Sequence, residues 1–369
     1  MHMKDGFKIR IFQPIAPEYR VALFNGLGRR YADRIDIWAA ESMGKDVSCP
    51  LSDMAYDYAH PFRRIGPFVW QTGLSLRGLS RGDVIVVCGD IHQLSSVWIA
   101  LKAKLRGIKV IWWGHHTTAY ANERKVGVRL LIARCLSDIY LCYTKTGISY
   151  LEKRGFVHGK VFATGNTIDQ KPIKQAMCDY DGADMFDGHP GVLCCSVLRE
   201  KVKLDLAIRA LTDHKLKDVR LAVIGDGPKK DDYMRLAEET GVAERIVWIG
   251  ATRDQKQMAP WFLSAKAFVY PGAVGLSILH SMSYGLPVVV HDNAEHQMPE
   301  YEIMEDGLTG FCFQENDAGD LAAKLAKVIN DRGLRSKMSE YCKTVAYEKY
   351  SMSQMVANFC EAIEAAAKL

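Results

Sequence analysis

The sequence predicts an α/β protein of two doubly wound domains, each a parallel β-sheet with helices packed on both faces. Short β-branched runs alternate with amphipathic stretches along the chain, which is the pattern of βαβ units. The length of 369 residues suggests about two domains. Hydrophobic residues make up 48% of the chain and charged residues 25%, which indicates a globular protein and excludes disordered, collagen-like and coiled-coil classes.

The first half contains short apolar runs that predict the strands of a buried sheet. They are Lys8–Gln13, Ile35–Ala39, Val84–Cys88, Lys109–Trp113 and Ile139–Tyr143. Amphipathic stretches between them predict helices over about 21–32, 94–106 and 125–136. Gly107 follows the second of these helices, as glycine often does at a helix end.

The second half repeats this alternation. Its predicted strands are Gly191–Cys195, Arg220–Ile224, Ile246–Ile249, Ala267–Tyr270 and Pro287–Val290. The stretch from about 317 to 369 is predicted to be helical. Asp, Gly and Pro accumulate in 179–190, so we expect the domain boundary near 166–191.

Several classes of protein and site are not supported by the sequence. No run approaches the roughly 18 apolar residues of a membrane-spanning helix, and residues 1–5 lack the features of a secretory signal. The ten cysteines form no CxxC pair and several lie in apolar runs, which favours buried thiols in a reducing cytosol over a disulfide framework or a zinc site.

Charge differs between the halves. Residues 1–170 carry 24 Lys and Arg against 14 Asp and Glu, whereas residues 171–369 carry 24 against 29. A basic first half beside an acidic second half suggests domains with different partners, although ordinary solvated surfaces would give the same counts.

In doubly wound folds, ligands bind in the loops that follow the strands. The loop Pro14–Arg20 contains two prolines and is rich in hydrogen-bond donors, which suits a ligand-binding loop that faces the cleft. It could equally be a plain connection between a strand and a helix, with Arg20 in solvent. The segment Trp112–His116 ends a buried strand, where a histidine can bond a ligand hydroxyl or be a satisfied loop residue. Adjacent histidines point in different directions, so at most one is expected to act on a ligand.

Two glycine-rich loops in the second half suggest nucleotide chemistry. Gly225-Asp226-Gly227-Pro228 is an incomplete dinucleotide fingerprint, because Lys230 stands at the third glycine position, so it gives little support for NAD. The stronger motif is a strand ending at Pro271, a flexible loop to Gly275, and a short helix over 276–284. The amides at the start of that helix suit an anionic pyrophosphate.

Taken together, these segments resemble the two-domain GT-B glycosyltransferases of the large retaining family 4 (glycosyl transferases group 1). The matching positions of its main motif are Pro271, Gly275, Gly285, Pro287, Val288 and Val289. Further matches are Val223–Pro228, Val247–Gly250, Pro299–Glu300, Asp306–Gly310, Pro17, Tyr19, Arg20 and a histidine near 115.

The resemblance implies a GT-B architecture, in which two Rossmann-like domains face each other across a cleft. The acceptor-binding domain would comprise residues 1–168, with a C-terminal helix over about 348–369 packing back on it. The donor-binding domain would comprise residues 169–347.

The sequence departs from the family at two positions. Relatives carry two glutamates eight residues apart, which would fall at Gly272 and His280 here. The first lies near the donor sugar in relatives and the second binds the ribose. His280 could accept a ribose hydroxyl as a neutral ring, and the backbone amide of Gly272 could approach the sugar.

The resemblance also implies a set of site residues. The catalytic candidates are His115, Lys201 and Gly272. The donor-binding candidates are Ser196, Arg199, Lys203, Gly225, Gly227, Ala251, Ala273, Val274, Gly275, Leu276, Ser277 and His280. The acceptor-binding candidates are Pro17, Tyr19, Arg20 and His116. Ser196 stands at the usual arginine position of the family's basic pair and Lys201 at the usual lysine, and Arg199 or Lys203 could supply the missing charge.

The implied activity is transfer of a sugar from a nucleotide diphosphate sugar, by default a UDP-sugar, to an acceptor hydroxyl with retention at the anomeric carbon. No metal and no cofactor are expected, and no nucleic acid partner. Cell-surface polysaccharide or glycolipid assembly would place the protein in the cytoplasm or at the inner face of the cytoplasmic membrane. The basic segments around 124–134 and at Arg29-Arg30 would contact an anionic acceptor or membrane there. The alternatives are a non-catalytic binding or scaffold protein, a sugar-nucleotide epimerase and, more remotely, a nicotinamide dehydrogenase.

Overall fold

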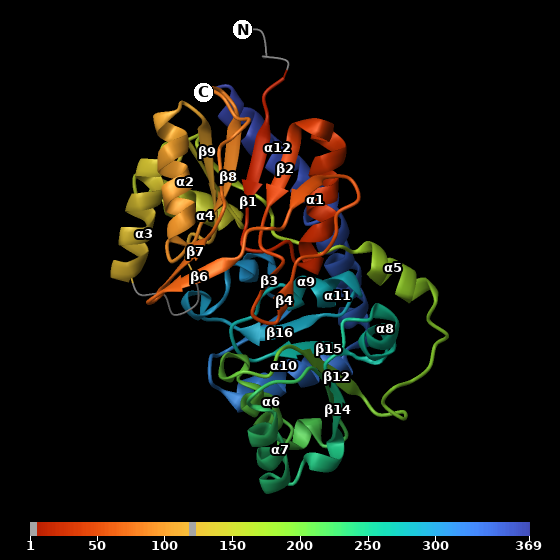
Figure 1. Ribbon diagram of the computed structural model, residues 1–369. Coiled ribbons are helices and arrows are strands. Elements are labelled where there is room, and N and C mark those ends of the chain that lie inside the picture. Colours follow the sequence, from red (N-terminus) through yellow and green to blue (C-terminus); the bar gives the residue numbers. More distant parts are fainter. Residues whose placement is uncertain (1–5, 118–122) are drawn as a thin grey trace. The chain divides into compact units, whose positions relative to one another are not determined.

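The computed structural model describes residues 6–117 and 123–369 (Figure 1). The chain divides into two compact units, the first comprising residues up to Asn166 together with Met352–Leu369, and the second comprising Thr167–Ser351. Each unit is a Rossmann-like domain with a parallel central sheet, which confirms the predicted fold class.

The central sheet of the first unit has seven strands in the order β11-β10-β9-β8-β1-β2-β5. Their bounds are β1 (Ile9–Phe12), β2 (Ile35–Trp38), β5 (Ala55–Asp57), β8 (Val84–Cys88), β9 (Lys109–Trp113), β10 (Ile139–Cys142) and β11 (Val161–Ala163). Two antiparallel hairpins lie outside this sheet, formed by β3 (Ser42–Met43) with β4 (Asp46–Val47) and by β6 (Phe62–Ile65) with β7 (Phe68–Gln71).

Helices cover both faces of this sheet because successive residues of each strand point to opposite sides. In β8, Val84 and Val86 pack with helices α1 (Glu18–Tyr31) and α12 (Met352–Ala367), whereas Ile85 and Val87 pack with α2 (Leu94–Leu105) and α3 (Glu123–Leu136). Helix α4 (Lys145–Glu152) also belongs to this unit.

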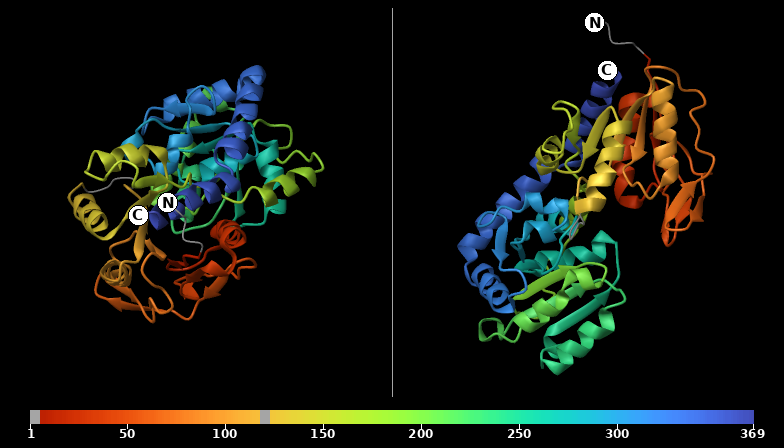
Figure 2. Two further views of the ribbon diagram at one scale, coloured as in Figure 1. Left: turned by 90° about the horizontal axis from the view of Figure 1, so that it is seen from above. Right: turned by 90° about the vertical axis from the view of Figure 1, so that its left-hand side faces the viewer.

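The C-terminal helix belongs to the first unit although it lies at the far end of the chain. Met355, Phe359 and Ile363 of α12 are fully buried against β9 and α1, and the blue helix lies against the red and yellow elements in Figures 1 and 2.

The sheet of the second unit has six parallel strands in the order β14-β13-β12-β15-β16-β17. They are β12 (Gly191–Cys195), β13 (Arg220–Ile224), β14 (Ile246–Gly250), β15 (Ala267–Tyr270), β16 (Val288–His291) and β17 (Gly310–Phe313). The helices are α5 (Lys171–Cys178), α6 (Leu204–Ala210), α7 (Lys230–Glu239), α8 (Gln255–Ser264), α9 (Ser277–Ser283), α10 (Ala318–Asn330) and α11 (Arg332–Thr344).

The strand orders locate a switch point in each sheet. In the second unit the chain builds outward from β12 through β13 to β14, and then restarts on the other side with β15. In the first unit the corresponding reversal lies between β1 and β8. Ligands of open α/β sheets bind beside such reversals at the carboxyl ends of the strands, so the loops after β12 and β15, and those after β1 and β8, are the candidate binding loops.

Arg29 and Arg30, one of the basic segments named above, lie in the last turn of α1, within the predicted helix over about 21–32. Each pairs with a carboxylate, Arg29 with Asp53 at 2.7 Å and Arg30 with Glu364 at 3.2 Å. In the described part of the chain, no helix combines the length and the apolar character that crossing a bilayer requires.

Candidate functional site

The loop after β12 is the centre of the candidate donor site, because the loops after β13 and β15 both close onto it. The amide of Ser196 donates to the Ile224 carbonyl at 3.0 Å, and the amide of Leu198 donates to the Asp226 carbonyl at 2.9 Å. The amide of Lys229 donates to the Leu198 carbonyl at 3.0 Å. Backbone hydrogen bonds therefore fix this loop against the end of β13.

Gly225 and Gly227 are required by this contact. A Cβ atom at Gly225 would overlap the Ser196 carbonyl oxygen, and one at Gly227 would come within 2.8 Å of the Leu198 amide nitrogen. Both residues also have positive φ angles, a region that disfavours larger side chains. The close approach of the β12 loop accounts for these glycines without a dinucleotide.

Gly272, the position where the resemblance led us to expect a glutamate, touches the other end of the same loop. The amide of Ala273 donates to the Lys201 carbonyl at 3.1 Å, and a Cβ at Gly272 would overlap that carbonyl oxygen. The space of an acidic side chain is thus occupied by the backbone of residues 201 and 202. Lys201, Gly272 and Ala273, three predicted site residues, are direct neighbours in the structure.

The glycine-rich loop is also held from the neighbouring strand. The amide of Val274 donates to Gln297 Oε1 at 2.8 Å, and Gln297 Nε2 donates to the His291 carbonyl at 3.0 Å. The Val274 amide is therefore engaged with Gln297. Helix α9 then starts at Ser277, preceded by Gly275 and Leu276, so the predicted helix over 276–284 is confirmed with slightly shorter bounds.

His280 lies on α9 in an aromatic environment. Its ring packs on Phe262 with a centroid distance of 4.8 Å, and its Nε2 lies 3.0 Å from Gln255 Oε1. Burial lowers the pKa of His280 to about 4, so the ring is neutral at neutral pH. Because the amide oxygen of Gln255 only accepts, Nε2 carries the proton and Nδ1 is the acceptor. This is the protonation state that binding of a ribose hydroxyl would need.

The basic residues of the β12 loop differ in their partners. Lys201 and Arg199 are exposed. Lys203 donates to Glu315 Oε1 at 2.8 Å and to Asn316 Oδ1 at 2.9 Å. Burial opposes the charge of Glu315, but hydrogen bonds from Lys203, His296 and Asn293 outweigh it and lower its pKa to about 2. The charge of Lys203 is therefore balanced within the protein, whereas Lys201 and Arg199 are the exposed cations of this loop.

The remaining donor candidates also lie at strand ends. Ser196 Oγ lies 3.1 Å from the hydroxyl of Tyr270, which ends β15. Ala251 follows β14 and is exposed. Glu315, Gln297 and Gln255 were missed by sequence reasoning because each follows a different strand and belongs to no motif. The rule that ligand-binding loops follow strands was the one signal that could have pointed to them.

The first unit holds the acceptor candidates. Pro17 caps α1, and Tyr19 is exposed. Arg20 is buried, which contradicts the alternative of a solvated side chain. His115 packs on the Tyr143 ring at 4.4 Å, whereas His116 packs on Tyr150 at 5.2 Å and is only 5% exposed. The two histidines thus point to different neighbours, and His116 keeps little surface for an acceptor.

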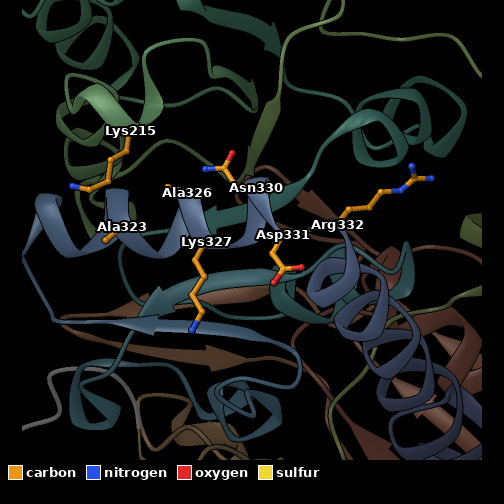
Figure 3. Close-up of a pocket in the computed structure, with 7 residues that line it drawn as sticks. All are labelled: Lys215, Ala323, Ala326, Lys327, Asn330, Asp331 and Arg332. Atoms are coloured by element: carbon orange, nitrogen blue, oxygen red, sulfur yellow. The ribbon is translucent and has the colours of Figure 1, made fainter.

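Figure 3 shows a separate open hollow on the second unit. Its lining residues are Lys215, Ala323, Ala326, Lys327, Asn330, Asp331 and Arg332. None of these is a predicted site residue, and they lie on α10, at the start of α11 and near α6. The hollow is therefore distinct from the candidate donor site. Within residues 6–117 and 123–369, no group of three or more His, Cys, Asp or Glu side chains is placed to hold a metal ion.

Comparison with known proteins finds a family similarity within the second unit. Residues 184–345 match the family model described as glycosyl transferases group 1. The matched residues all lie within Thr167–Ser351. The match includes the β12 loop, the glycine-rich loop and α9, which contain most of the donor candidates.

Two curated proteins are similar to part of this chain. The chain is 34% identical over 141 residues to sulfoquinovosyl transferase SQD2 of Arabidopsis thaliana, covering 37% of this chain and 26% of that protein. It is 29% identical over 129 residues to the lipopolysaccharide core biosynthesis glycosyltransferase LpsE of Rhizobium meliloti, covering 34% and 36%. The chain therefore spans little more than a third, at most, of these curated relatives.

The fold likeness extends over both units. The structure of HepE from Anabaena in complex with UDP superposes with a TM-score of 0.67 at 14% identity, covering 96% of this chain and 99% of that one. This similarity concerns the fold alone.

Replacing Gly272 by Ala is expected to destabilise the second unit by about 1–3 kcal/mol, because the new methyl group overlaps the Lys201 carbonyl. Gly275→Ala is the matched control, since a Cβ there meets no atom within 4 Å. Urea denaturation of both variants measures the difference. Equal stabilities would contradict the close packing of the two loops.

The buried histidine predicts a pH dependence of stability. The pKa of His280 is near 6.5 in the unfolded chain and about 4 in the folded one, so the unfolded state binds the proton first as the pH falls. Its contribution, present above pH 6.5, is lost between pH 6.5 and 4, by up to about 3 kcal/mol. When the pH is lowered from 6.5 to 4, the urea midpoint of His280→Gln should fall less than that of the wild-type protein. His214→Gln, which alters an exposed ring, is the control and should behave as wild type does. Parallel pH profiles for all three proteins would count against a neutral His280.

Proposed function

We propose that this protein is a retaining glycosyltransferase, which moves a sugar from a nucleotide diphosphate sugar to an acceptor hydroxyl. The observation that carries the proposal is the closure of the glycine-rich loop of a glycosyl transferases group 1 domain onto Lys201, beside the switch point of the sheet. Uracil is the proposed base, and the UDP complex of the fold relative HepE supports this choice.

In the proposed reaction the sugar–phosphate bond breaks and negative charge grows on the β-phosphate oxygen. Lys201 and Arg199, whose side chains are exposed on the β12 loop, would stabilise that charge without a metal. The leaving phosphate would take the proton of the acceptor hydroxyl on the same face of the sugar, which gives retention. His115 would bond a sugar hydroxyl as a neutral ring, since burial and the nearby Arg129 lower its pKa to about 4.

The substitution at position 272 favours a second candidate. Without a carboxylate near the donor sugar, the fold could serve as a non-catalytic nucleotide-binding or scaffold protein. The two functions differ in turnover. A scaffold would bind UDP but would not cleave a UDP-sugar to release UDP. A sugar-nucleotide epimerase would convert the donor without any acceptor.

Lys201→Ala is expected to lower the rate of UDP release from UDP-sugars by about a hundredfold, because a cation that stabilises the leaving diphosphate is lost. Release would be measured with a panel of UDP-sugars and with water or simple alcohols as acceptors. Lys337→Ala, which alters an exposed lysine on α11, is the control and should keep the wild-type rate. Early-time NMR of an alkyl glycoside product should show the anomeric configuration of the donor.

Two results would contradict this proposal. UDP binding without release from any donor would favour the scaffold function. A Lys201→Ala variant as active as Lys337→Ala would remove the proposed role of Lys201, and a product of opposite configuration would exclude retention.

The proposed acceptor is a glycan or glycolipid at the inner face of the cytoplasmic membrane, which the protein would contact peripherally. Two neighbouring helices of the first unit, α2 and α3, expose apolar side chains at one-turn and two-turn spacings. They are Trp98, Leu101 and Leu105 on α2 and Val128 and Leu131 on α3. Exposed basic residues accompany them, namely Lys102, Lys104, Arg106, Arg124, Lys125 and Arg134. An apolar strip flanked by cations suits an anionic lipid surface.

Leu105→Asp is expected to reduce sedimentation with vesicles that contain phosphatidylglycerol at low salt, because Leu105 is 79% exposed in this strip. Val157→Asp changes a residue that is 61% exposed in a loop of the same unit and is the matched control. Equal sedimentation of both variants and wild type would remove α2 and α3 from the proposed membrane contact.

A further inference from the structure

A buried arginine in the first unit lacks the partner that such a residue normally has. Arg20 lies in the first turns of α1 and is only 6% exposed. Its guanidinium lies over the rings of Trp113 at 4.9 Å and Tyr143 at 5.4 Å, and its Nη1 contacts the sulfur of Met355 at 3.7 Å. In the part of the chain that the structure describes, no carboxylate pairs with it.

Arg10, a second buried arginine of the same unit, has the partners that Arg20 lacks. It is 9% exposed and forms a bidentate ion pair with Asp36, in which Nε donates to Oδ1 at 2.8 Å and Nη2 donates to Oδ2 at 2.7 Å. Its Nη1 donates to the carbonyls of Ser75 and Arg77, at 3.2 and 3.0 Å. A buried guanidinium stays charged and costs free energy unless such partners compensate it. Arg20 has stacking rings and a sulfur contact in their place.

The surroundings of Arg20 are also cationic. His115 shares the Tyr143 ring with Arg20, and the charged groups that act on His115 besides its neighbour His116 are Arg129 and Arg20. Arg129 donates through Nη2 to the His116 carbonyl at 2.7 Å, while its Nε and the Nδ1 of His115 are buried without a hydrogen-bond partner. The carboxyl ends of β9 and β10 thus gather two guanidinium groups, and among the side chains that the structure describes no carboxylate pairs with either of them.

We propose that Arg20 binds an oxyanion of the acceptor, a carboxylate or a phosphate, with Arg129 adding to the positive field. That the anion belongs to an acceptor rests on the proposed function, but the anion site itself does not depend on that function. The planar guanidinium, its faces packed by aromatic rings, would offer its edge to two oxygens of the anion. Acceptors that carry an acidic sugar or a sugar phosphate would then be preferred over neutral ones.

The test uses the full chain with its donor site filled by excess UDP, so that added anions cannot bind there. Glucuronate supplies the carboxylate and glycerol 3-phosphate the phosphate, with glucose and glycerol as neutral counterparts. Thermal unfolding and calorimetry at constant ionic strength measure binding. At least one anion is expected to bind in the millimolar range or tighter, and Arg20→Gln should weaken that binding about tenfold or more.

Two variants separate binding from folding. Arg20→Lys keeps the charge without the planar edge and should restore part of the affinity. Arg81→Gln alters an exposed arginine of the same unit, in the turn before β8, and should bind the anion as wild type does. UDP affinity should be the same in all of these proteins.

Four outcomes separate the two proposals. Anion binding that depends on Arg20 supports the site, and the anion that binds names its source. Equal anion binding by Arg20→Gln and wild type, or no anion binding by wild type that holds UDP, overturns it. Arg20-dependent binding in a protein that binds no UDP would overturn the proposed function and leave the anion site standing.

Discussion

The backbone of residues 196–202 lies in contact with the loops after two other strands, and the candidate donor site depends on this contact. Gly225 and Gly227 let the β13 loop approach from one side, and Gly272 lets the β15 loop approach from the other. Each approach brings backbone atoms so close that no side chain fits between them. The position of the Lys201 backbone relative to the glycine-rich loop is therefore set by main-chain packing and not by a side-chain contact.

This constraint leaves no room for a side chain at position 272. A glutamate there and the observed path of residues 201 and 202 exclude each other sterically. Position 280 holds a neutral histidine, which contacts Gln255 and an aromatic ring. Neither position places negative charge next to the proposed diphosphate. The internal acid Glu315 is matched by Lys203, so Lys201 and Arg199 keep their charge for a ligand.

Much of the fold could be predicted from the sequence because the buried parallel strands are continuous apolar runs. The strands β8, β9, β12, β13 and β15 have the predicted bounds. The strand β5 and the hairpins of residues 42–71 were missed, since their residues are mostly exposed and show no apolar run. The long helical stretch from residue 317 proved to be α10, α11 and α12 with a π-helical turn over Val345–Lys349, so one periodic pattern covered elements of two units.

The candidate site was predictable only where a motif carried it. The glycine-rich loop and α9 were visible in the sequence. The hydrogen bond from the Val274 amide to Gln297 and the ion pair of Lys203 with Glu315 were not, because each joins residues that are distant in the chain. The burial of Arg20 was also hidden, because Trp113, Tyr143 and Met355 come from three separate segments. Such contacts follow from the topology of the sheets, which spacing in the sequence does not reveal.

We propose above all that the loops after β12 and β15 form a site for a nucleoside diphosphate. The most direct test of this site is a calorimetric titration of the purified protein with UDP, GDP and NAD, without added metal. We expect micromolar binding of UDP, weaker binding of GDP and no binding of NAD. No binding of UDP or GDP, or tighter binding of NAD than of either, would contradict it.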